Sequence, residues 1–77
     1  MSGPAIEQVD ETAHGVTVKT TLSNIDHKLM FTKVADGIAF PTSMLQDGES
    51  NPLMKQDIPP PILETLETEF GLEIIRR

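Results

Sequence analysis

The dipeptide Asp36-Gly37 stands between two apolar runs, and it constrains the fold more than any other feature of the chain. Asp-Gly favours the two-residue type I′ hairpin turn, because both central residues of that turn have positive φ. Such a turn pairs Ala35 with Ile38, and side-chain alternation then assigns each neighbour to one face of the sheet. The predicted core face carries Leu29, Phe31, Ala35, Ile38 and Phe40, with Lys33 as its one charged member. The predicted opposite face carries Met30, Thr32, Val34 and Ala39.

Three segments have the pattern of strands in an antiparallel meander. Residues 16–22 alternate between apolar and polar side chains, which is typical of a half-buried strand. Residues 28–35 and 38–41 form the predicted hairpin, and Pro41 marks the end or the edge of its second strand because proline cannot donate to a ladder. Thr42 and Ser43 are candidate caps for a short helical turn after that strand.

Residues 62–70 predict the only clear helix. Ile62, Leu63, Leu66 and Phe70 fall within one arc when each residue is placed 100° on from the last. Prolines suit the first helical position, and Gly71 is placed to end the helix in the left-handed conformation. Residues 72–75 then predict a final strand.

These elements predict a small two-layer α+β domain over residues 1–77. An antiparallel sheet of three to four strands, in the order β-β-β-loop-α-β, packs one C-terminal helix on one face. We expect residues 1–13 to be a flexible segment or an edge strand. We expect residues 46–61, which contain several Pro, Gly and Asp residues, to form a long loop.

Composition narrows the classes of function. The net charge is −6, from 12 acidic and 6 basic residues, and this acidity disfavours non-specific binding to nucleic acid. There is no cysteine, which fits a reducing cytoplasm and excludes thiolate zinc sites. No apolar run reaches the length of a membrane span, so we expect a cytoplasmic protein that does not enter a membrane.

No constellation of residues predicts catalysis. His14 and His27 are expected at opposite ends of a strand, on the surface, where they cannot share a metal ion. Glu64 and Glu67 are expected on the solvated side of the helix rather than as an acid–base pair. We therefore predict that the protein is not an enzyme and has no catalytic residue, no metal, no cofactor and no small-molecule substrate.

Surfaces left over by this fold predict a protein–protein interaction or regulatory module, acting as a homodimer. The second sheet face, with Met30, Val34 and Ala39, is apolar where a monomer favours polar groups. Either another chain covers that face, or residues 44–58 fold over it. The acidic helix face, which carries Glu64, Glu67 and Glu69, is the second predicted contact surface.

Two alternatives involve nucleic acid. Residues 37–45, with the sequence Gly-Ile-Ala-Phe-Pro-Thr-Ser-Met-Leu, resemble the strand–proline–helix step of AbrB-like swapped-hairpin transcription factors. That resemblance implies an intertwined dimer that binds DNA, although the chain lacks the basic residues that the family places near this step. The nucleic-acid contacts would then be Lys19, Lys28 and Lys33. A further alternative is an acidic inhibitor that mimics nucleic acid.

Overall fold

The computed structural model describes residues 5–22 and 24–76 and shows a six-stranded sheet with one α-helix. In chain order the elements are β1 (Ala5–Glu11), β2 (Gly15–Leu22), β3 (Ile25–Ala35), β4 (Ile38–Gln46), β5 (Glu49–Pro52), a 3-10 helix η1 (Lys55–Asp57), α1 (Pro60–Phe70) and β6 (Glu73–Ile74). The α+β class, the antiparallel sheet and the C-terminal helix are confirmed. The sheet has more strands than the three to four predicted.

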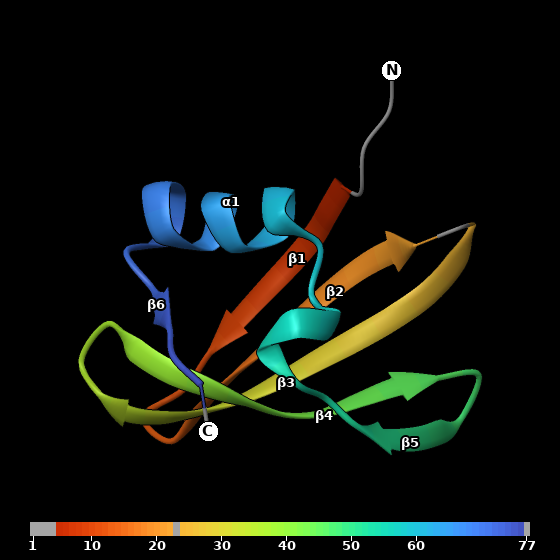
Figure 1. Ribbon diagram of the computed structural model, residues 1–77, viewed down its shortest axis with the longest axis horizontal. Coiled ribbons are helices and arrows are strands. Elements are labelled where there is room, and N and C mark those ends of the chain that lie inside the picture. The colour runs from red at the N-terminus through yellow and green to blue at the C-terminus, as the bar shows by residue number, and fades with distance from the viewer. Residues whose placement is uncertain (1–4, 23, 77) are drawn as a thin grey trace.

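The sheet is an antiparallel meander in which β1 to β5 lie in sequence order (Figure 1). Strand β6 departs from this order and pairs in parallel with the start of β4, on the same side as β5. The C-terminal strand thus returns beside the β3–β4 hairpin that the sequence placed at the centre of the fold.

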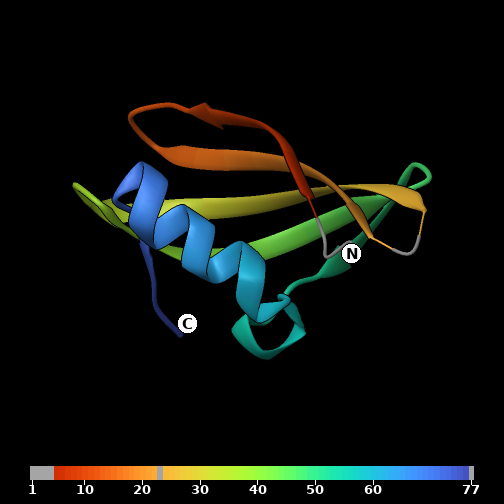
Figure 2. The same cartoon turned by 90° about the horizontal axis from the view of Figure 1, so that it is seen from above.

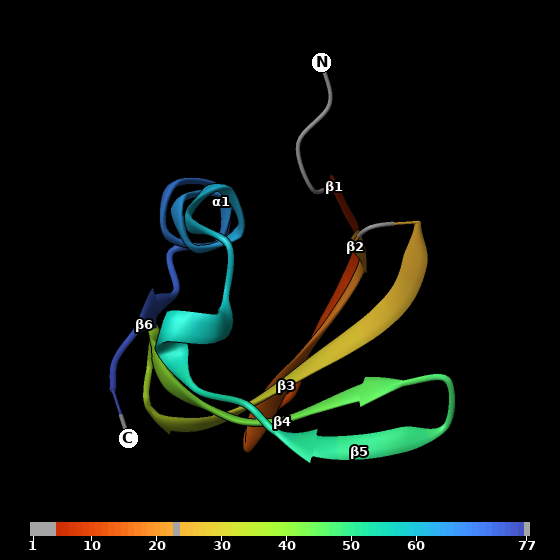
Figure 3. The same cartoon turned by 45° about the vertical axis from the view of Figure 1, so that its right-hand side comes forward.

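The helix and the 3-10 turn cover one face of this sheet. The sheet is strongly bent, and α1 and η1 both lie on its concave side (Figure 3). Seen from above, α1 runs obliquely across the strands (Figure 2). Between the layers lies one apolar core, made of Val16, Val18, Leu29, Phe31, Ala39, Leu53, Ile58, Ile62, Leu66, Leu72 and Ile74.

The chain has two Asp-Gly turns, and they differ in conformation. Asp36-Gly37 was predicted to form a type I′ turn, and this prediction is wrong. Asp47 and Gly48, between β4 and β5, both have positive φ, of 51° and 80°. At the β3–β4 turn only Gly37 has positive φ, 77°, so Asp36-Gly37 makes a turn that is not type I′. The reversal at Asp36-Gly37 and the pairing of Ala35 with Ile38 are nonetheless present.

A β-bulge at Val34 overturns the predicted faces of β4. Ala35 pairs with Ile38, but Lys33 pairs with Ala39, so β3 contains one extra residue. An extra residue shifts the alternation by one and exchanges the two faces. Phe31 therefore lies across from Pro41 instead of sharing a face with Phe40. Ala39 is fully buried in the core, whereas Ile38 and Phe40 are only partly buried on the other face.

Strand β4 continues through Pro41 instead of ending there. No helical turn follows at Met44 and Leu45, because β4 extends to Gln46 and pairs with β5. The strand–proline–helix step implied by the resemblance to AbrB-like proteins is therefore absent. The predicted loop 46–61 contains β5 and η1, and its apolar residues Leu53 and Ile58 enter the core beside α1. They do not cover the opposite face of the sheet.

The helix follows the sequence prediction closely. Proline occupies its first positions, and Gly71 ends it with φ 66°. Ile62 and Leu66 are buried and Leu63 is partly buried, but Phe70 is 43% exposed and does not belong to the core as predicted.

Part of the N-terminal segment forms the first strand of the sheet. β1 is an edge strand paired with β2, while residues 1–4 lie outside the described part of the chain. In residues 5–22 and 24–76, no helix has the length and apolar content needed to cross a membrane.

Candidate protein-binding groove

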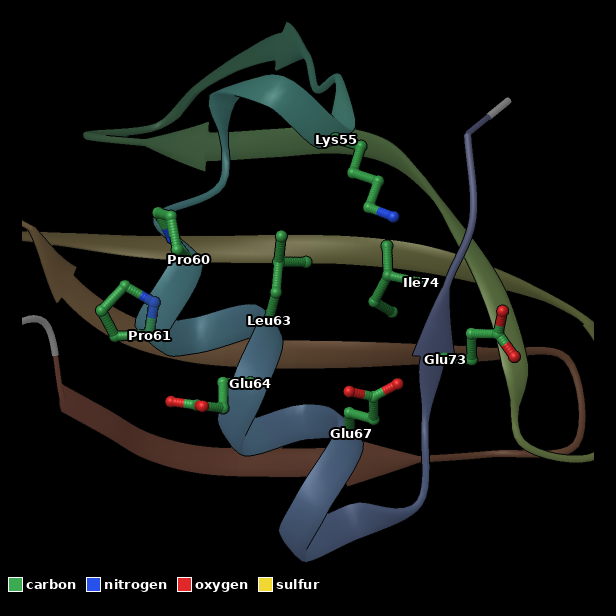
Figure 4. A pocket seen from close by; sticks show the side chains of 8 residues that line it. All are labelled: Lys55, Pro60, Pro61, Leu63, Glu64, Glu67, Glu73 and Ile74. Atoms are coloured by element: carbon green, nitrogen blue, oxygen red, sulfur yellow. The ribbon is translucent and has the colours of Figure 1, made fainter.

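A groove of about 530 Å³ lies between α1, η1 and β6 (Figure 4). Leu63 of α1 and Ile74 of β6 supply apolar surface, and Pro60 and Pro61 line the end near the start of the helix. The remaining lining residues are charged: Lys55, Glu64, Glu67 and Glu73. Figure 4 shows Lys55 reaching from η1 toward Ile74, with Glu64 and Glu67 extending from α1.

The helical period explains why these residues of α1 reach the groove. Ile62 and Leu66 are fully buried against the sheet, and side chains three or four positions apart share one side of a helix. Glu64 and Glu67 are three positions apart and therefore project together, away from the core. Gly71 then turns the chain, so that Glu73 and Ile74 return along the same side of the helix.

Negative charge dominates the groove. Among the described residues it holds three carboxylates and one ammonium group, and Lys55 forms no ion pair with those carboxylates. The described residues contain one ion pair, Lys33 to Glu11 at 2.7 Å, and it involves none of the groove residues. The carboxylates are nevertheless too dispersed for a metal site, because no cluster in the described ranges brings together three potential ligands. The groove thus combines an apolar floor with carboxylates that lack a cationic partner.

Two of the predicted helix contacts, Glu64 and Glu67, line this groove. Glu69 is exposed on the same helix but does not line it. Lys55 and Glu73 also line the groove, and neither was predicted as a contact residue. Nothing in their local pattern connects them to Glu64, since only the return of β6 beside η1 and α1 brings these residues together.

The sheet face away from α1 is partly apolar, as predicted, but some of its residues differ from those predicted. Met30 is partly exposed, and Val34, at the bulge, is 54% exposed. Ala39 is on the core side and fully buried, so its side chain does not reach this surface. Phe40 and Leu45 take its place, because both alternate with residues that face the core.

The three predicted nucleic-acid contacts do not form one patch within the chain. Lys19 and Lys28 are exposed and lie directly across from each other on β2 and β3. Lys33 lies on the other face, next to the core, where its side chain is 12% exposed and paired with Glu11.

The histidines differ from each other in their surroundings. His14 is exposed, as predicted. His27 is buried, contrary to the prediction, and its Nδ1 lies 2.8 Å from the carbonyl oxygen of Ile25. Thr20 faces His27 across β2 and β3, so a polar pair occupies one edge of the core.

Comparison with known protein families, curated proteins and solved structures finds no match for this chain.

Proposed function

We propose that this protein is a non-catalytic protein-interaction module whose acidic groove binds a basic segment of a partner protein. The observation that carries this proposal is the gathering of Glu64, Glu67 and Glu73 around apolar surface from Leu63 and Ile74. Arginine or lysine side chains of a partner would pair with the carboxylates. Neighbouring aliphatic side chains would cover the apolar floor.

Charge supports a basic partner over an acidic one. The chain carries −6 overall, and Lys55 is the only cation that lines the groove in the part of the chain that the structure describes. A nucleic-acid backbone would meet repulsion at this surface. We therefore favour a protein partner over nucleic acid. We do not propose Lys19, Lys28 or Lys33 as contact residues.

Fluorescence anisotropy with a labelled peptide of alternating arginine and valine tests the proposal. We expect binding that weakens as salt rises, because the screening length falls from about 10 Å at 0.1 M to about 3 Å at 1 M. A peptide of alternating glutamate and valine should not bind. Absence of arginine–valine binding at millimolar peptide would refute the proposal.

The double variant Glu64→Gln/Glu67→Gln locates the site. Each exposed ion pair contributes about 0.2–1 kcal/mol, so losing two weakens binding by roughly 2- to 30-fold. The matched control is Glu49→Gln/Glu69→Gln, which makes the same change in net charge at exposed residues outside the groove. Equal losses in the two double variants would indicate a general charge effect and would contradict the groove as the site.

Self-association is the second candidate function, supported by the uncovered sheet face. Met30, Phe40 and Leu45 are partly exposed on the side away from α1. A second copy packed on this face would bury these residues and give a homodimer. Sedimentation velocity over a range of micromolar concentrations tests it, and a monomer at every concentration would rule it out.

A further inference from the structure

Strand β6 has hydrogen-bonding capacity that the described fold does not use. The N–H of Glu73 donates to the carbonyl oxygen of Gly37 at 2.7 Å, and the N–H of Ile75 donates to that of Ala39 at 2.8 Å. Because backbone groups alternate in direction along a strand, the N–H and C=O of Ile74 point away from β4. No strand of the described residues pairs with these two groups, since β4 is the only partner of β6 there.

These groups of Ile74 lie at a free edge of the sheet, because β6 pairs only with β4 among the described residues. A row of backbone N–H and C=O groups that no strand pairs is a template for a further strand. The N–H and C=O of Ile74 therefore mark a place where another strand would be bonded. No second strand borders β6 in the described part of the chain, since its only partner there is β4.

The acidic groove provides a path beside this strand. Glu73 and Ile74 both line it, with Leu63, Glu64 and Glu67 of α1 on the opposite side. A second hollow of about 420 Å³ adjoins it at the C-terminal end of β6, lined by Arg76 and Met54 among others. Lys55 lines both hollows.

The other free edges of the sheet are less suited to an added strand. β1 carries Glu7, Gln8, Asp10 and Glu11 and contains a bulge between Ile6 and Gln8, features that oppose edge pairing. β5 is exposed along its whole length and ends at Pro52. Among the edge strands of the described residues, only β6 combines backbone groups that no strand pairs with an adjoining acidic groove.

We propose that β6 accepts an extended basic segment of a partner protein as an added β-strand. The segment would exchange backbone hydrogen bonds with the N–H and C=O of Ile74, and its basic side chains would lie among Glu64, Glu67 and Glu73. This inference rests on the proposed function, and it specifies the mode of binding as β-augmentation. A partner of opposite charge is favoured over a second copy, because each copy carries −6.

The test compares backbone-modified forms of one peptide. Three probes are titrated: the hexapeptide of alternating arginine and valine, and two analogues that are N-methylated at either its arginines or its valines. Only alternate N–H groups of an added strand face β6, so one analogue should lose more than tenfold in affinity and the other less than threefold. Hydrogen exchange of the Ile74 amide should slow at least tenfold on saturation with the unmodified peptide, while amides of β5 stay unchanged.

Failure of this inference is distinguishable from failure of the proposed function. Salt-dependent binding that neither methylation alters, without protection of Ile74, would overturn strand addition and leave the basic partner in place. No binding of the unmodified peptide would overturn both. Protection of Ile74 that appears without peptide as protein concentration rises would assign the edge to a second copy, and would also overturn the inference.

Discussion

Leu66 is the residue whose truncation most directly tests the packing of α1 on the sheet. Its side chain is fully buried within the single apolar core. Its carbonyl oxygen accepts hydrogen bonds from the N–H groups of Gly71 and Leu72, the latter at 2.9 Å, which closes the end of the helix. Leu66→Ala keeps these backbone bonds and the helical propensity, so it removes packing alone.

The expected loss of stability is large for a chain of this size. The change removes about three methylene equivalents, at about 0.8 kcal/mol each, and leaves a cavity, so we expect a loss of about 3 kcal/mol. At about 0.05–0.15 kcal/mol per residue, 77 residues give a total stability of about 4–12 kcal/mol. The unfolding entropy, about 2.1 cal/mol/K per residue, then converts 3 kcal/mol into a fall in Tm of about 19 °C.

Urea unfolding followed by circular dichroism measures this loss, with Phe70→Ala as the control on the same helix. Phe70 is 43% exposed, so its truncation should cost only about 1 kcal/mol. The slope of the transition should stay unchanged while its midpoint falls. A loss below about 1 kcal/mol for Leu66→Ala, or a greater loss for Phe70→Ala, would refute the assignment of Leu66 to the core and of Phe70 to the surface.

Two further substitutions test local features. Gly37→Ala should lower the stability in thermal unfolding more than Gly48→Ala does. Both glycines have positive φ, which strains any added side chain. A Cβ on Gly37 would also lie 2.9 Å from the carbonyl oxygen of Gly71, whereas a Cβ on Gly48 would meet nothing within 4 Å. Equal losses would mean that the contact between the hairpin turn and Gly71 is absent. Lys33→Met should change the free energy of unfolding by less than about 1 kcal/mol, because Glu11 is 44% exposed and regains water when its partner is lost; a loss above about 3 kcal/mol in urea unfolding would show that the pair is far more shielded than this.

The local elements of this fold could be predicted from the sequence, because the residues that indicate each element lie within a few positions of one another. Proline before residue 62 and glycine at residue 71 delimit α1, and the alternation of Val16 and Val18 defines β2. The reversal at Asp36-Gly37 was predictable for the same reason. Part of the candidate groove could also be predicted, since the spacing of Glu64 and Glu67 places both on one side of a helix.

Which side chains of β4 lie on which face could not be predicted, because this depends on a bulge. One extra residue at Val34 exchanges the environments of Ala39 and Phe40. Valine has no local preference for a bulge that would indicate it in the sequence. The position of Pro41 misled the prediction in a similar way. Proline suggests a strand end, yet here the strand continues through it, with a second register shift one residue further on.

The sequence by itself determined the class of the fold, the place of its helix and the acidity of the chain, because these follow from short-range periodicity, capping residues and charge. Tertiary structure alone decided which side chains share a face and which charges share a groove. Glu73 and Lys55 join Glu64 because β6 returns beside β4. The outer edge of β6 stays free because no further strand of the described residues borders it. Such juxtapositions arise from pairings between distant segments, and they are set by the packing of the whole chain.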